Sequence, residues 1–249
     1  MDKGRNVYVE GFYLFWKMRY FVIILSATIS LLISVTNLYP QFENSVMTGQ
    51  GIAWSYFVYF GFRYFLDPES TDKQNLKFVH KFMLRCVLSG ILLFILAFII
   101  SFLIITFAGI DDYLLMAIIV FLFVISSIVL FLSFAGTWFP AIALGENKGL
   151  VSAIRSGRPV AAYILSRFIG GVAPAIILSF VPLLLVAVSG VQPEAISPTG
   201  SIGYSIIIAG FLGLVLEGLC LTILVVVLSR AYQRIRAEGA IADTDPVPE

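Results

Sequence analysis

A single carboxylic acid, Glu217, stands near the middle of the long apolar segment 204–229. A charged side chain at the centre of a bilayer costs at least about 2.5–3.5 kcal/mol on insertion scales unless it is protonated or paired. Glu217 is therefore expected to face protein or water. It shares a narrow face of small residues with Ala209, Gly210 and Gly213, which predicts that another helix approaches closely there.

Two interpretations of Glu217 remain open. In the functional one, the carboxyl group binds a proton or a cation. In the structural one, it makes a hydrogen bond to a neighbouring helix. The structural interpretation is favoured because no Lys, Arg or His lies in the core of any predicted span, and an acid without a second ionisable residue makes a poor relay.

Proline and glycine interrupt the apolar segment 168–188, which contains Pro174 and Pro182 after a Gly-Gly pair. Proline inside a helix removes a backbone donor and tends to kink the helix. A kinked helix can act as a gate. It can also simply fit around its neighbours, and we favour this second interpretation because glycine and proline are common in membrane helices.

The connection 139–159 is basic, with Lys148, Arg155 and Arg158. It predicts a short interfacial helix whose apolar residues face the membrane while these three cations face the headgroups. The cations are candidate contacts for anionic lipid headgroups or for a partner. Simple anchoring of the cytoplasmic side by positive charge is the favoured alternative.

Other chemistry finds little support in the sequence. His80 is the only histidine, and Asp111 and Asp112 have no histidine near them, so we expect no metal site. Cys86 and Cys220 lie in or beside apolar helices and are expected to be reduced. The net charge of +1 gives no reason to expect nucleic-acid binding. Without nucleotide-binding or hydrolase motifs, neither an enzyme nor a cofactor is expected.

Composition predicts an integral membrane protein. Of 249 residues, 59% are apolar and only 12% are charged, about half the share of charge in soluble domains. The segment 47–66 is aromatic and contains Arg63, so by itself it also suits an interfacial helix, and its Trp54 is predicted to mark the outer interface. The apolar runs that are long enough to cross a bilayer are residues 20–39, 86–108, 113–134, 168–188 and 204–229.

The distribution of charge decides in favour of six spans. If residues 47–66 cross the membrane, all 16 Lys and Arg residues fall on one side. Basic residues collect on the cytoplasmic side of membrane proteins, so both termini are predicted to lie in the cytoplasm. The predicted fold is an all-α bundle of six transmembrane helices with short interfacial amphipathic helices. The basic segments are residues 1–19, 63–85, 135–167 and 230–249.

The chain is expected to form one membrane domain, residues 20–229, with cytoplasmic segments on both sides. Residues 1–19 are aromatic and basic, which predicts an interfacial helix. Residues 230–249 are predicted to be a cytoplasmic tail that is partly disordered, because the residues after Gly239 include two prolines and few apolar side chains.

The connection after the fourth predicted span carries a family resemblance. A proline at the end of that span, Pro140, is followed by a short acidic-glycine turn and a patterned helix. The residues of this helix pattern are Gly149, Leu150, Ala153, Ile154, Arg155 and Ser156. In these features the chain resembles small bacterial six-span inner-membrane proteins related to the glycerophosphodiester phosphodiesterase membrane-domain family. Gly157 and Arg158 depart from the Ser-Trp pair usual there.

The resemblance implies a module of the bacterial cytoplasmic membrane. It implies no phosphodiesterase activity, which in that family belongs to a separate soluble domain. We expect a non-enzymatic protein that organises or modulates membrane components through the bilayer, anionic headgroups, a membrane-protein partner or a second copy of itself. The alternative is a small secondary transporter or channel that uses Glu217.

Overall fold

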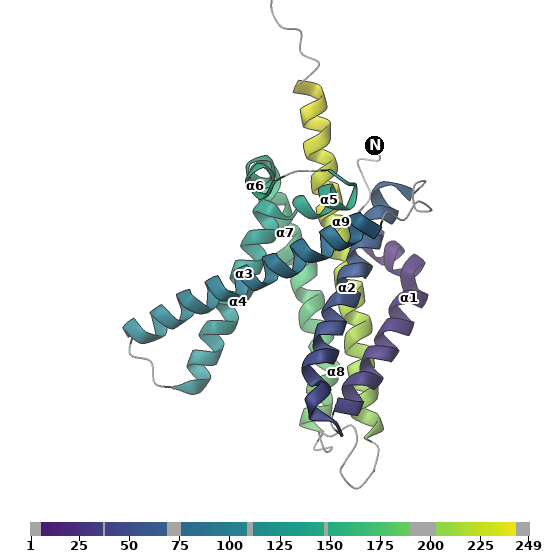
Figure 1. Ribbon diagram of the computed structural model, residues 1–249, viewed down its shortest axis with the longest axis vertical. Coiled ribbons are helices and arrows are strands. Elements are labelled where there is room, and N and C mark those ends of the chain that lie inside the picture. Colours follow the sequence, from purple (N-terminus) through teal and green to yellow (C-terminus); the bar gives the residue numbers. More distant parts are fainter. Residues whose placement is uncertain are drawn as a thin grey trace, which may run out of the picture. The chain divides into compact units, whose positions relative to one another are not determined.

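The computed structural model describes six stretches of the chain, residues 6–36, 38–68, 76–108, 112–146, 149–189 and 203–242. Within them every regular element is a helix and no strand occurs (Figure 1). The prediction of an all-α protein is therefore confirmed for these residues. The long helices are α1 (Val7–Thr36), α2 (Glu43–Leu66), α3 (Leu76–Ala108), α4 (Tyr113–Ala135), α8 (Ala173–Val188) and α9 (Tyr204–Ala242).

Short helices fill the connections. The turn η1 (Pro40–Phe42) leads into α2, and four short elements link α4 to α8. These are α5 (Trp138–Ala143), α6 (Leu150–Gly157), the 3-10 turn η3 (Arg158–Val160) and α7 (Ala161–Arg167). A π-helical turn, η4 (Phe168–Val172), then joins α7 to α8.

Among the described residues, five helical stretches are long and apolar enough to cross a membrane, which supports a membrane-embedded helical bundle. α2 is not among them, although its 24 residues reach roughly 36 Å at about 1.5 Å per residue. Its aromatic, polar and glycine residues lower its hydropathy, and the sixth span stays a prediction. The five stretches are Val7–Thr36, Phe78–Ala108, Ile118–Ala135, Leu150–Val186 and Tyr204–Glu238.

Two helices continue past the boundaries expected from hydropathy. α1 is unbroken from Val7, so residues 7–19 form its first turns rather than a separate helix. α9 runs for 39 residues and continues past residue 229 as far as Ala242. The part of the predicted disordered tail after residue 242 lies outside the described residues.

The chain divides into two compact units, which are considered separately. The first unit comprises residues 1–68 and 167–227, and the second comprises residues 69–166 and 228–249. α9 contributes to both units.

In the first unit, α1, α2, α8 and the first part of α9 run alongside one another (Figure 1). α1 and α9 are antiparallel, because Gly11 packs on Ile223 while Gly218 packs on Val22. Small residues permit this approach, and in a bilayer such close packing is a main source of helix association. The buried core contains Val22, Ile29, Trp54, Phe57 and Leu214.

The second unit is built around α5, all of whose residues are buried. The Phe139 ring packs edge-on against Phe82 and Phe131, with centroid separations of 6.0 and 6.1 Å. Aromatic pairs in this geometry stabilise a core beyond the area they bury. α6 lies directly against the end of α4, since a Cβ atom at Gly157 would overlap the backbone oxygen of Phe134.

Candidate functional site

Glu217 lies on α9 in the first unit and is half-buried. Two side chains on α2, Trp54 and Gln50, direct hydrogen-bond donors at the Glu217 carboxyl group. The Trp54 side chain is 6% exposed, and its indole nitrogen has no partner that meets full hydrogen-bond geometry. We conclude that the N–H is directed at the Glu217 carboxyl group in an incomplete hydrogen bond. Trp54 is thus a core residue, and its prediction as an interface marker was wrong.

The two glycines predicted to allow close packing contact different helices. A Cβ atom at Gly213 would lie 3.0 Å from the backbone oxygen of Ser179 on α8. A Cβ atom at Gly210 would lie 3.5 Å from the hydroxyl oxygen of Ser30 on α1. The small-residue face of α9 is therefore shared between two neighbours, with Glu217 one turn beyond Gly213.

A serine stripe on α1, formed by Ser26, Ser30 and Ser34, was missed in the sequence. All three side chains are buried, at 0%, 5% and 4% exposure. The Ser30 hydroxyl donates to the backbone oxygen of Ile207 on α9 at 3.0 Å, and Ser34 donates to the Ser30 oxygen at 2.7 Å. Ser26 Oγ has no hydrogen-bond partner among the described residues. The signal was present in the sequence, as serine at every fourth position of an apolar helix.

The two prolines of the predicted kink lie in α8, and the kink itself stays a prediction. Pro174 is exposed in the first turn of α8, where proline is well tolerated, and Pro182 lies inside the helix. The π-helical turn comes just before them and includes Gly171. A Cβ atom at Gly171 would overlap the ring of Tyr8, so this turn is covered by the start of α1. Single π-turns in helices occur frequently at functional sites.

The basic connection is only partly as predicted. Arg155 and Arg158 are exposed, and Lys148 lies outside the described residues. Val151 is 76% exposed and shares the outward face with the two arginines, since the three positions follow helical spacing. The opposite face carries Gly157 and packs against α4.

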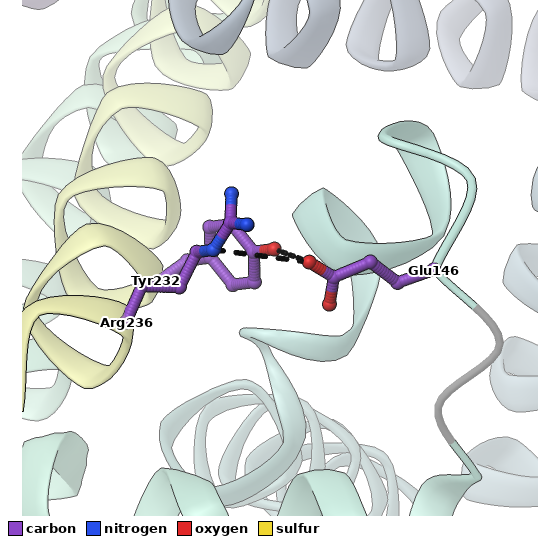
Figure 2. Close-up of polar contacts among 3 residues, drawn as sticks. All are labelled: Glu146, Tyr232 and Arg236. Carbon is purple, nitrogen blue, oxygen red and sulfur yellow. Dashed lines mark hydrogen bonds and ion pairs between the residues drawn. The ribbon is translucent and has the colours of Figure 1, made fainter. Parts of the chain in front are cut away.

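A second polar cluster was not singled out from the sequence. Figure 2 shows Tyr232 and Arg236, both from α9, pointing toward Glu146 in the second unit. The Tyr232 hydroxyl donates to Glu146 Oε1, and the Arg236 Nε atom lies 4.0 Å from the same oxygen. The Tyr232 side chain is fully buried, so this hydrogen bond fixes the end of α9.

The backbone after α5 positions Glu146. Gly145 has a φ of 85°, the left-handed conformation that favours glycine at the end of a helix. The Glu146 N–H bonds to the oxygen of Ala141 at 2.9 Å, and the Gly145 N–H bonds to Ile142 at 2.9 Å. This pattern is a Schellman motif, which turns the chain sharply and directs the next side chain, Glu146, toward α9.

A cation–π contact adds to the same attachment. The Arg234 guanidinium lies 3.9 Å from the centroid of the Tyr163 ring on α7. Such contacts contribute about 0.5–1 kcal/mol at exposed sites. The end of α9 is therefore held to both α7 and the turn after α5.

The described residues contain no cluster of three or more His, Cys, Asp or Glu side chains that could hold a metal ion. Fold and sites together define a helical membrane protein with one polar cluster inside its apolar helices and another at the end of α9. No protein-family model, curated protein or solved structure matches the chain. The resemblance to the phosphodiesterase membrane-domain family therefore stays a prediction.

Proposed function

We propose that the chain is a non-enzymatic, multi-pass protein of the bacterial cytoplasmic membrane that organises anionic lipid around its cytoplasmic face. In this proposal six helices cross the bilayer and both termini are cytoplasmic. The placement of all 16 basic residues on one side supports this arrangement. The roughly 36 Å length of α2 also exceeds the bilayer core of about 30 Å.

The observation that carries the lipid-binding role is the exposed face of α6. The contact between Gly157 and α4 holds α6 in place, and Arg155 on α6 and Arg158 at the start of η3 are exposed. Because the backbone of this segment is already held by packing, binding of phosphate oxygens has to order only the Arg155 and Arg158 side chains, which limits the entropic cost of binding. Val151 beside them supplies an apolar contact for acyl chains.

Lipid retention tests this role. The protein is extracted from vesicles of phosphatidylglycerol and phosphatidylethanolamine, and retained lipids are counted by native mass spectrometry. We expect the Arg155→Gln, Arg158→Gln double variant to retain less phosphatidylglycerol than the native protein, by about one molecule per site lost. The control is Lys17→Gln together with Arg19→Gln on α1, which removes the same charge. Equal losses in both variants would show that total charge, and not the α6 face, holds the lipid.

Cysteine labelling tests the six-span arrangement in a background without native cysteines. An impermeant reagent applied from outside should label cysteines placed at Gln41, Asp112 and Pro193. It should not label those at Asp72 and Asn147. Labelling at Asp72 would remove the second span from the proposal.

A small transporter or channel is the second candidate, favoured by the polar side chains that gather around Glu217. Its test is uptake into proteoliposomes at two pH values. Under this candidate Glu217→Gln keeps the fold and abolishes proton-coupled or cation-coupled uptake, because an amide cannot exchange a proton. A well-folded variant with full pH-dependent uptake would exclude this role for Glu217.

A further inference from the structure

The seam between α1 and α9 has a defined register. Ser30 lies opposite Gly210, and Val22 lies opposite Gly218. Because the helices are antiparallel, Ser26 falls midway between these levels, beside the turn of α9 that follows Gly213. Glu217 is one turn further along, roughly 5 Å at about 1.5 Å per residue.

On one side of Glu217 the seam contains buried hydroxyl groups beside the apolar core residues Ile29 and Leu214, and on the other side it contains aliphatic side chains. Toward the end where α9 begins at Tyr204, α1 contributes the serine stripe Ser26, Ser30 and Ser34, all buried. In the opposite direction, Val22 and Ile223 fill the seam and are themselves buried. A hydroxyl group both donates and accepts hydrogen bonds and can therefore bind water, whereas packed aliphatic side chains exclude water.

Ser26 differs from its neighbours on α1. Thr28 and Ser34 satisfy their hydroxyl groups by donating to a carbonyl one turn earlier, at 2.9 and 2.7 Å. Ser26 Oγ has no such bond, and the indole nitrogen of Trp54 also lacks a partner of full geometry within the described residues. A buried polar group left unsatisfied costs about 1–3 kcal/mol. Water that bridges two or more such groups removes that cost.

Each helix that packs near Glu217 presents few ionisable groups. α2 presents Gln50 and Trp54, which do not titrate. On α9 the Cys220 thiol interacts with the Glu217 carboxylate. That thiol also donates to the backbone oxygen of Val172, the last residue of η4, at 3.6 Å. Among the described residues, Cys220 is thus the one other titratable group recorded as interacting with Glu217.

We propose that Glu217 takes up and releases a proton through water held along the serine stripe, from the end of the bundle where α9 begins. In this exchange, hydronium transfers a proton to the Glu217 carboxylate, and the products are the carboxylic acid and water. Under the six-span arrangement, that end faces the outside. This inference goes beyond the proposed lipid organisation. It describes a path by which protons reach Glu217, and only the use of that path in transport rests on the transporter candidate.

Infrared difference spectroscopy tests the exchange without any transport measurement. Native protein and Glu217→Gln are compared in lipid nanodiscs across a range of about pH 5 to about pH 9. Subtracting the two spectra isolates the carboxylic C=O band of Glu217. On transfer to D2O, this band should shift within the mixing time, because water reaches the group. The thermal midpoint of Glu217→Gln, compared with that of the native protein, establishes that both are folded.

Two variants on α1 test the route. Ser26→Val removes the hydroxyl and adds an apolar group in the seam, so the shift should become slow enough to follow after mixing. Thr28→Val removes a hydroxyl from the exposed side of the same helix and should leave the rate unchanged. Should Ser26→Val fail to fold, Ser26→Ala removes the hydroxyl without adding bulk and should also slow the shift.

Three results would overturn the proposal. A band that persists in D2O means that Glu217 is sealed from water. Absence of the band at every pH means that Glu217 does not take up a proton. A shift equally fast in the Ser26 and Thr28 variants means that water arrives by another route. Since uptake is not measured, any of these results leaves the lipid-binding role to be judged by its own assay.

Discussion

Gly218 is a position in the first unit where one added methyl group should be destabilising. A Cβ atom there would lie 2.7 Å from Val22 Cγ1 and 3.3 Å from the Trp54 ring. Carbon atoms pack at about 3.5–4.0 Å, so α9 and α1 would have to separate by about 0.8 Å or more. Val22 is fully buried and its β-branched side chain is stiff, so it cannot turn away.

The energy of Gly218→Ala is a balance of two opposing terms. Forcing a methyl group into a packed core costs about 1–3 kcal/mol. Replacing glycine by alanine inside a helix returns about 0.5–1 kcal/mol. We therefore expect a net loss of about 1–2 kcal/mol. For a chain of this size that corresponds to a thermal midpoint lower by about 2–8 °C.

The matched control is Gly51→Ala on α2, where nothing lies within 4 Å of the added Cβ atom. It keeps the helix-forming gain without the steric loss, so its thermal midpoint should be unchanged or slightly higher. Both variants are measured by thermal unfolding in the same detergent. If Gly218→Ala is as stable as Gly51→Ala, the close approach of α9 to α1 and α2 is refuted.

Three further substitutions probe other contacts of α9. Gly213→Phe should reduce accumulation in membranes far more than Val215→Phe, because only the first pushes α8 away; equal accumulation would contradict the packing. Glu217→Ala should lower the thermal midpoint because it leaves the Trp54 and Gln50 donors unsatisfied, whereas Glu217→Gln should preserve the midpoint. Equal midpoints for the two variants would contradict these hydrogen-bond contacts. Tyr232→Phe should destabilise the second unit by about 1 kcal/mol in thermal unfolding, while Tyr13→Phe, at an exposed position of α1, should be neutral. Matching midpoints for the two tyrosine variants would count against the hydrogen bond.

The apolar helices were predictable because hydropathy acts locally along the chain. Long runs without charge require helices in a bilayer, where every backbone group must bond within its own segment. The same reasoning placed Glu217 in the interior of a helix. It could not identify Trp54 and Gln50 as its neighbours, because nothing local in either segment records which helices pack together.

Polarity also gave an incomplete account of the basic connection. From the sequence, the apolar residues of α6 were predicted to face the membrane. The buried positions of this helix are the small residues Ala153 and Gly157. Small side chains determine this face because they let two backbones meet, a property that hydrophobicity does not measure. The bond between Tyr232 and Glu146 joins residues 86 positions apart and left no sequence signal.

The division of α9 between the two units has a consequence for biogenesis. α9 is synthesised after all the other described helices, yet its residues complete the core around Val22 and Trp54 as well as the attachment at Glu146. The packing of α1 and α2 therefore stays incomplete until the helices α3 to α8 and then α9 have been synthesised. Partly assembled helices with exposed polar groups are vulnerable to misassembly. A nascent chain arrested before Tyr204 would leave both units incomplete, so quality-control proteases should remove it as a whole.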